Sequence, residues 1–142
     1  MSLPPISELT VRVNYSEVDQ MGVVYHARYI VWLDMARTEH LRRAGTTYRE
    51  MEESGFRLVV GELQMRFSRP ARYDDLVRIR CWVRELASRR VTFGYAIELA
   101  EGGEPLATGT TAMMVLDARM RPTRLPAEIR SALMEVSDPV RI

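Results

Sequence analysis

Strict alternation of apolar and polar residues is the feature that most limits how this chain folds. Beyond residue 60, three successive segments alternate with a period of two, 63–68, 77–84 and 91–99, and residues 106–116 follow as the last long strand. This period places every second side chain on the same face of a strand, so each segment is predicted to be a half-buried strand. The Gly102-Gly103 pair between the last two segments is typical of a hairpin turn. We therefore expect an antiparallel sheet with tight connections.

The first third of the chain changes period once. Residues 9–15 alternate and predict a first strand, whereas residues 26–44 carry apolar side chains at spacings of three and four, which predicts a long helix. Its main apolar face comprises Tyr29, Trp32, Leu33, Ala36, His40 and Ala44. Further apolar residues, Ile30, Val31 and Met35, lie elsewhere on its circumference, so we expect protein all around it. Gly45 is expected to end the helix.

Two shorter helices complete the prediction. Residues 46–53 are expected to form a short helix ending at Gly55, and Pro126 begins a closing helix that runs to Met134. A run of antiparallel strands with one buried helix is an α+β architecture. We expect one curved antiparallel sheet wrapped around one long central helix, as a single domain over residues 1–142.

Composition excludes several classes of function. The formal net charge is +1, so no broad electrostatic surface for nucleic acid is expected. No apolar run approaches the roughly 20 residues that span a membrane, and residues 1–5 have no pattern of a secretory signal. A single cysteine, Cys81, agrees with a reducing cytoplasm, where we expect the protein to reside.

The turn between the first strand and the long helix holds the clearest chemical signal. It places Asp19 just before a helix start, where backbone N–H groups lack partners and the helix dipole is positive. A carboxylate beside such an oxyanion site suits attack on an activated carbonyl. By spacing alone, Asp19 is equally a turn or capping residue.

The whole segment resembles the hotdog-fold acyl-CoA thioesterases, in particular the 4-hydroxybenzoyl-CoA group and its Tol-Pal-associated branch. The matching residues are Tyr15, Asp19, Gly22, Val23, Val24, Tyr25, His26 and Tyr29, followed by Ala36-Arg37-Thr38-Glu39. Pro70, Tyr73, Asp74-Asp75 and residues 88–93 also match, so that the resemblance covers roughly residues 9–116. Arg28 departs from the pattern, in which asparagine or another uncharged residue is common.

The resemblance implies hydrolysis of a small acyl-CoA to free acid and CoA. Asp19 is then the nucleophile or general base, with Tyr15 and His26 in the site. Backbone N–H groups at Tyr25 and His26 would form the oxyanion site. Arg89 and Arg90 would hold CoA phosphates. No metal or cofactor is implied. The expected assembly is a homodimer or homotetramer, and an acyl-carrier protein is an alternative carrier of the acyl group.

Several of these residues also fit purely structural roles. Tyr15 shares the parity of the first strand and fits a core tyrosine, His26 fits a capping residue, and Arg89 and Arg90 fit solvated charges near a turn. Trp82 alternates with arginines and is expected to be exposed, as at a subunit interface.

Three other residues are assigned structural roles. His40 and Cys81 are expected in the core, and Glu39 in a salt bridge. Two rival functions remain: a hydratase or dehydratase of the same fold, and an acyl-CoA-binding module without catalysis. The first lacks its characteristic Pro-Gly or Asp-x-Asn-x-x-His pattern in this chain.

Overall fold

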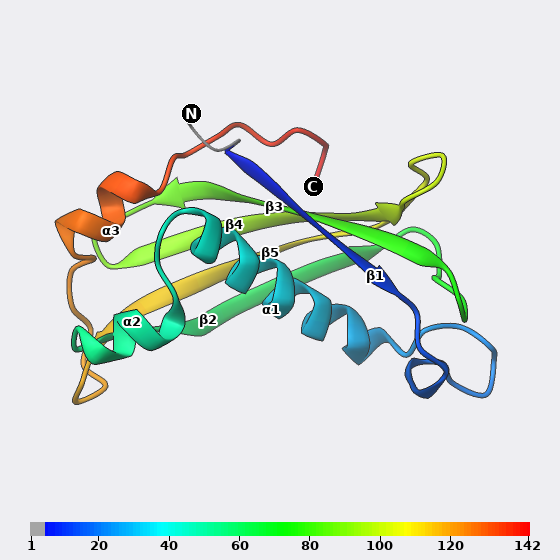
Figure 1. The fold of residues 1–142 in the computed structure, drawn as a ribbon, viewed down its shortest axis with the longest axis horizontal. Helices are drawn as coiled ribbons and strands as arrows, with labels where there is room; N and C mark the ends of the chain where they lie inside the picture. The colour runs from blue at the N-terminus through cyan, green and yellow to red at the C-terminus, as the bar shows by residue number, and fades with distance from the viewer. Residues whose placement is uncertain (1–4) are drawn as a thin grey trace.

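A computed structural model describes residues 5–142 and shows one antiparallel sheet with a long helix across one face (Figure 1). Residues 1–4 lie outside the described part. They belong to residues 1–5, in which no secretory signal is expected. The strands are β1 (Ile6–Arg12), β2 (Phe56–Phe67), β3 (Leu76–Leu86), β4 (Arg90–Leu99) and β5 (Pro105–Asp117). Their order in the sheet is β1-β3-β4-β5-β2, and every neighbouring pair is antiparallel. The expected α+β hotdog architecture is confirmed.

The helices begin and end close to the predicted positions. They are α1 (His26–Arg43), α2 (Tyr48–Glu53) and α3 (Ala127–Ala132). Gly45 ends α1 with a φ of +97°, a conformation that glycine adopts without steric cost. Thr47 caps α2, since its hydroxyl accepts a hydrogen bond of 3.2 Å from the N–H of Glu50. None of the helices described here is long and apolar enough to cross a bilayer.

The core lies between α1 and the sheet. The predicted face of α1 is buried, with Tyr29, Trp32, Leu33, Ala36 and His40 each at most 7% exposed. It packs against inward side chains of the sheet that include Ile79, Cys81, Phe93, Tyr95, Met113 and Val115. The expectation that protein surrounds α1 is wrong within one protomer, because Ile30, Val31 and Met35 are 40–46% exposed. A second apolar face of the helix thus remains at the surface.

The first strand ends earlier than its alternation predicts. β1 stops at Arg12, and Tyr15 begins a single turn of 3₁₀ helix, Tyr15–Glu17. Asn14 caps this turn: its side chain accepts from the N–H of Ser16 (3.1 Å), and Glu17 accepts from the N–H of Asn14 (2.8 Å). Tyr15 is consequently 75% exposed, and its interpretation as a core tyrosine is wrong. The local capping bonds override the parity of the strand.

β2 begins seven residues before the predicted start at Leu63. Its pairing with β5 shifts register between Val60 and Glu62, as in a β-bulge. The extra residue interrupts the alternation, so that a search for a period of two does not detect the first half of the strand. β2 also lies at one end of the sheet, so its outer edge has no partner strand within the described residues.

Trp82 is fully buried, contrary to the prediction of an exposed interface residue. Its ring lies against Gly94, where an added Cβ would come within 2.5 Å of the indole. Its Nε1–H donates to Asp138 (3.0 Å), which also pairs with Arg84. The C-terminal segment after α3 therefore covers this part of the outer face of the sheet. Trp82 lies on the outer face of the sheet, as its alternation predicts, but a segment more than fifty residues further along the chain covers that face.

Candidate active site

Asp19 lies in a tight turn that is closed by bonds within the turn itself. Its backbone N–H donates to the carbonyl of Val23, and the N–H of Gly22 donates to the carbonyl of Asp19, both at 2.9 Å. Its Oδ1 accepts from the N–H of Met21 at 2.9 Å. Gly22 has a φ of +78°, which allows the chain to reverse here. The half-buried carboxylate is thus oriented by its own turn.

The start of α1 offers backbone donors next to this turn. Tyr25 is the N-cap residue, and no side-chain capping bond is found there within the described chain. The N–H of Tyr25 donates to the carbonyl of Glu17 (2.9 Å) and is therefore engaged. Among residues 5–142, the N–H groups of His26 and Ala27 have no backbone acceptor outside the helix. Because the first helical N–H groups cannot bond within a helix, these two are the natural oxyanion donors.

Two of the expected side chains surround this helix start. Tyr25 is 49% exposed, and its ring lies 4.6 Å from the imidazole of the exposed His26. Tyr15 precedes the turn and packs its ring edge-to-face on Tyr73, with centroids 5.6 Å apart. Tyr73 was part of the matched pattern but was not predicted as a site residue.

Glu17 fixes the approach of this segment to the helix, a role that the sequence analysis missed. One carboxylate oxygen caps the 3₁₀ turn, and the other accepts a hydrogen bond of 3.0 Å from Nε1 of Trp32 on α1. The signal was the spacing of Asn14 and Glu17, which is that of a capping box.

A groove opens beside the N-terminus of α1. Its lining residues are Val24, His26, Tyr29, Phe67, Ser68, Arg69 and Pro70. The buried Tyr29 hydroxyl accepts a hydrogen bond from the N–H of Ala71 (2.9 Å), and burial raises the pKa of this tyrosine. A second, more apolar groove follows the middle of α1 along β2, lined by Ile30, Val31, Leu33, Asp34, Arg37, Val60, Leu63 and Thr111.

Arg37 forms a buried polar network at the base of this second groove. Its guanidinium donates to the hydroxyls of Tyr48 (2.6 Å) and Tyr95 (3.1 Å) and pairs with Asp34. The Tyr95 hydroxyl also bonds Thr111 at 2.6 Å, and burial raises the pKa of Tyr95. The signal missed in the sequence was a charged residue directly after Ala36 on the apolar face of the helix.

Arg89 and Arg90 lie at the far end of the sheet from Asp19. The turn of Asp19 is bridged to Arg72, just before β3, whereas Arg90 begins β4 next to the end of β3. The ten residues of β4 separate the two ends by about 30 Å (Figure 1). Both arginines are exposed, and Arg90 pairs with Glu85 at 3.2 Å. Within one protomer, Arg89 and Arg90 therefore lie far from Asp19.

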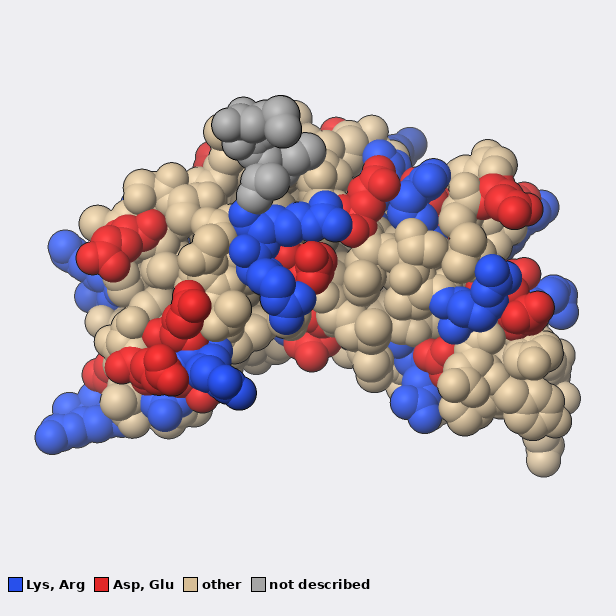
Figure 2. All heavy atoms as spheres, in the orientation of Figure 1, with Lys and Arg blue, Asp and Glu red and all other residues tan. Residues whose placement is uncertain are grey.

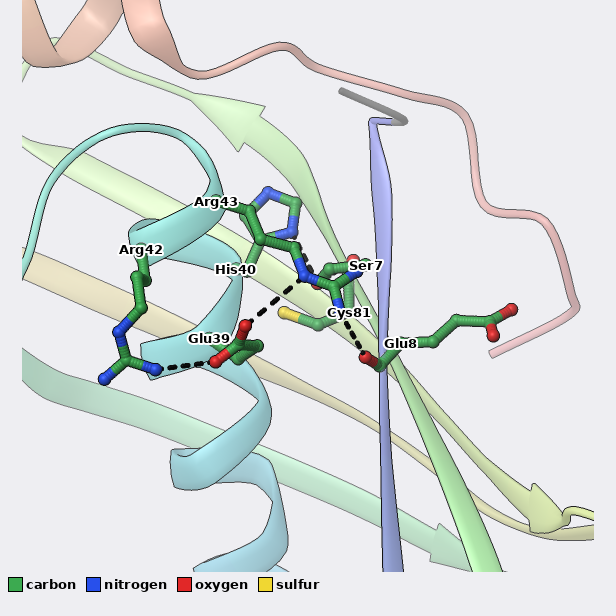
Figure 3. Close-up of polar contacts among 7 residues, drawn as sticks. All are labelled: Ser7, Glu8, Glu39, His40, Arg42, Arg43 and Cys81. Carbon is green, nitrogen blue, oxygen red and sulfur yellow. Dashed lines mark hydrogen bonds and ion pairs between the residues drawn. The ribbon is translucent and has the colours of Figure 1, made fainter. Parts of the chain in front are cut away.

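The remaining polar residues of interest have structural roles. His40 is buried and shares a hydrogen bond of 2.8 Å with Ser7 of β1, whose hydroxyl also donates to the carbonyl of Cys81 (Figure 3). Burial lowers the pKa of His40 and raises that of the Cys81 thiol. The predicted core positions of both residues are confirmed, as is the predicted salt bridge of Glu39, which pairs with Arg42 and Arg43.

Charged side chains are mixed over the surface rather than gathered by sign. Figure 2 shows arginines interspersed with acidic residues across the face that it presents. No group of three His, Cys, Asp or Glu side chains within residues 5–142 is arranged to hold a metal ion.

Comparison with known proteins identifies the family of the chain. The family model of the thioesterase-like superfamily matches residues 13–133. The acyl-CoA thioesterase YbgC of Haemophilus influenzae is 33% identical over 86% of this chain and 90% of its own length. A hypothetical protein of Thermus thermophilus superposes with a TM-score of 0.84 at 40% identity, covering 89% of this chain and 96% of that one.

A third relative carries a substrate in its name. The DHNA-CoA thioesterase of Staphylococcus aureus superposes with a TM-score of 0.80 at 30% identity, covering 84% of this chain and 80% of that one. The region that matches the family model spans the Asp19 turn, α1 and all strands except β1. The chain therefore belongs to the thioesterase-like superfamily of hotdog-fold proteins and is a thioester hydrolase.

Proposed function

We propose that this protein hydrolyses small acyl-CoA thioesters to the free acid and CoA, with Asp19 as nucleophile or general base. The observation that carries the proposal is the short loop that joins the Asp19 turn to the start of α1. The N–H of Tyr25 bonds the carbonyl of Glu17, and Val18 bridges Val24, so that the loop closes on itself. A carboxylate and two unengaged helix N–H groups are thereby held within one compact segment.

The chemistry follows from this arrangement. Attack on the thioester carbon pushes the carbonyl electron pair onto oxygen, where the N–H groups of His26 and Ala27 stabilise the negative charge. Collapse of the tetrahedral adduct breaks the C–S bond and releases the CoA thiolate. If Asp19 itself attacks, an acyl-aspartyl anhydride forms and water then hydrolyses it. If Asp19 is a general base, it takes a proton from the attacking water instead.

The proposal includes a second copy of the chain. Arg89 and Arg90 reach an Asp19 site only from another protomer, because about 30 Å of β4 separates them within one chain. The unpaired edge of β2 and the exposed apolar face of α1 support such an association. We expect a homodimer or a homotetramer with guanidinium groups of one protomer on the CoA phosphates bound to the next. An acyl-carrier protein as the donor and the cytoplasm as the location remain predictions.

Release of CoA from a panel of aliphatic and aromatic acyl-CoA compounds tests the reaction. Asp19→Asn should lower kcat/KM by about a hundredfold or more, because the amide is neither nucleophile nor base. The amide oxygen still accepts the bond from Met21, so the turn is retained. Asp117→Asn is the matched control, since Asp117 accepts turn bonds from Arg119 and Arg121 in the same way, at the other end of the sheet from Asp19. It should keep full activity.

The outcomes separate the rival functions. Binding of acyl-CoA without turnover across the panel would favour a binding module, and hydration of an enoyl-CoA without thiol release would favour a hydratase. Full activity of Asp19→Asn would exclude Asp19 from the chemistry. In the wild type, label that appears in the Asp19 carboxylate after a single turnover in ¹⁸O-water indicates an anhydride that water cleaves at the aspartyl carbonyl.

A further inference from the structure

The turn of residues 71–75 is bonded to all three segments that build the candidate site. The N–H of Val13 donates to the last carbonyl of the turn, and the N–H of Val24 donates to its first, both at 2.9 Å. The first N–H of the turn donates to the hydroxyl of Tyr29 on α1, also at 2.9 Å. The turn therefore connects the approach to Tyr15, the Asp19 loop and the helix.

Tight internal geometry holds this turn in shape. The carboxylate of Asp75 accepts a hydrogen bond of 2.8 Å from the N–H of Arg72. The backbone N–H of Asp75 donates in return to the carbonyl of Arg72 (3.1 Å). Asp74 has a φ of +68°, a left-handed conformation that is sparsely populated outside glycine. Such conformations persist where the surroundings determine them, and they cluster at functional sites.

Tyr73, at the tip of the turn, packs on Tyr15. The ring centroids are 5.6 Å apart and the planes meet at 84°, an edge-to-face arrangement. The two side chains are 55% and 75% exposed, so neither belongs to the core. Within the described residues, neither hydroxyl has a hydrogen-bond partner among the side chains or the backbone. The contact with Tyr73 is therefore an aromatic contact that restrains the exposed ring of Tyr15.

This restraint acts close to Asp19. Tyr15 begins the 3₁₀ turn, and its carbonyl accepts from the N–H of Val18, the residue before Asp19. An exposed tyrosine without a packing partner changes rotamer freely on a fast timescale. The ring of Tyr73 removes that freedom, because it favours one orientation of its neighbour over the others.

We propose that Tyr73 is a positioning residue of the hydrolytic site: its ring holds the ring of Tyr15 beside the Asp19 turn, where Tyr15 contacts the acyl group. The inference rests on the proposed function, since it assigns Tyr15 to the substrate. Tyr73 acts through its ring rather than its hydroxyl, because only the ring makes the contact.

Kinetics with an acyl-CoA that the wild type hydrolyses test this role. Tyr73→Ala should lower kcat/KM by about two- to tenfold, the range expected for loss of one aromatic pair. Tyr73→Phe should match the wild type. In a Tyr15→Ala background, Tyr73→Ala should cause no further loss. Met134→Ala, which removes another exposed apolar side chain far from the site, is the control and should have no effect.

Two results would overturn the proposal: full kcat/KM of Tyr73→Ala, or an equal loss with and without Tyr15. The proton shifts of the Tyr15 ring provide a readout independent of turnover. They should move in Tyr73→Ala and stay in Tyr73→Phe, and unchanged shifts in the alanine variant would refute the contact. If the wild type cleaves no acyl-CoA, the proposed function fails while the NMR result still decides the pairing.

Discussion

At the scale of single residues, burial separates the titratable groups that solvent can reach from those that are enclosed in the core. His26 is exposed beside the helix start, whereas His40 is 7% exposed and bonded to Ser7. Both histidines lie on α1, and only their environments separate their roles. A neutral His40 shares a hydrogen bond with the Ser7 hydroxyl and places no charge in the core, where a buried charge would need a compensating partner.

His40 therefore predicts a dependence of stability on pH. Burial, with a smaller effect from the charge of Arg43, lowers the pKa of His40 in the folded state below its usual value of about 6.5. The stability that this implies is fully present above about pH 6.5 and is lost as the pH falls below it. The slope is at most about 1.4 kcal/mol per pH unit for one proton.

Urea unfolding at pH 7.5, 6.5 and 5.5 measures this effect. His40→Gln should reduce the loss of unfolding free energy on acidification relative to the wild type. His26→Gln, at the exposed histidine, serves as the control and should keep the slope of the wild type. An unchanged slope in His40→Gln would contradict the assignment.

At the scale of elements, the C-terminal segment behaves as a cover for the outer face of the sheet. Val136 donates to the carbonyl of Val83 (3.0 Å), and Glu135 accepts from the N–H of Leu86 (2.5 Å). Asp138 adds the bond to Trp82 described above. Together these bonds dock eight residues without regular structure on the end of β3.

Truncation after Met134 should therefore lower the unfolding free energy by about 2–4 kcal/mol, from several hydrogen bonds of roughly 1 kcal/mol each. Trp82 should become exposed, with a red shift of its fluorescence. Asp138→Asn is the milder comparison, since it keeps the bond to Trp82 and loses only a half-exposed ion pair with Arg84 worth about 1 kcal/mol or less. A truncated chain that unfolds at the same urea concentration as the full chain would disprove the covering role.

Elements also show where prediction from sequence reaches its limit. The long helix and all five strands were found, at least in part, because each has a period that a few neighbouring residues reveal, and the two short helices were found from their end signals. The start of β2 was missed at the Val60–Glu62 bulge, where the period breaks. Tyr15 was placed on a strand because its parity matched, while the capping bonds of Asn14 and Glu17 decided otherwise. The turn of Asp19 was recognised from its motif. Tyr73, in a turn more than fifty residues further along the chain, was not predicted as a site residue.

At the scale of the whole molecule, we propose that a second protomer completes the site. Hybrid dimers test this directly. We expect Asp19→Asn and Arg89→Glu/Arg90→Glu to be impaired as homodimers. A hybrid dimer of the two, purified with two tags, should recover about half of the wild-type activity, since one of its two sites combines an intact Asp19 with intact arginines. A fully active Arg89→Glu/Arg90→Glu homodimer would remove the arginines from binding, and absence of recovery in the hybrid would contradict a site shared between the two protomers.

The sequence by itself determined the kinds of element, the curved sheet around one helix and the segment that we propose for the site, because periodicity and turn chemistry are local properties. Tertiary structure decided the order β1-β3-β4-β5-β2, the burial of Trp82, the meeting of Tyr15 with Tyr73 and the separation of Arg89 from Asp19. These outcomes depend on contacts between residues far apart in the chain. No local pattern encodes such contacts, since a side chain's parity states which face it occupies but not what covers that face.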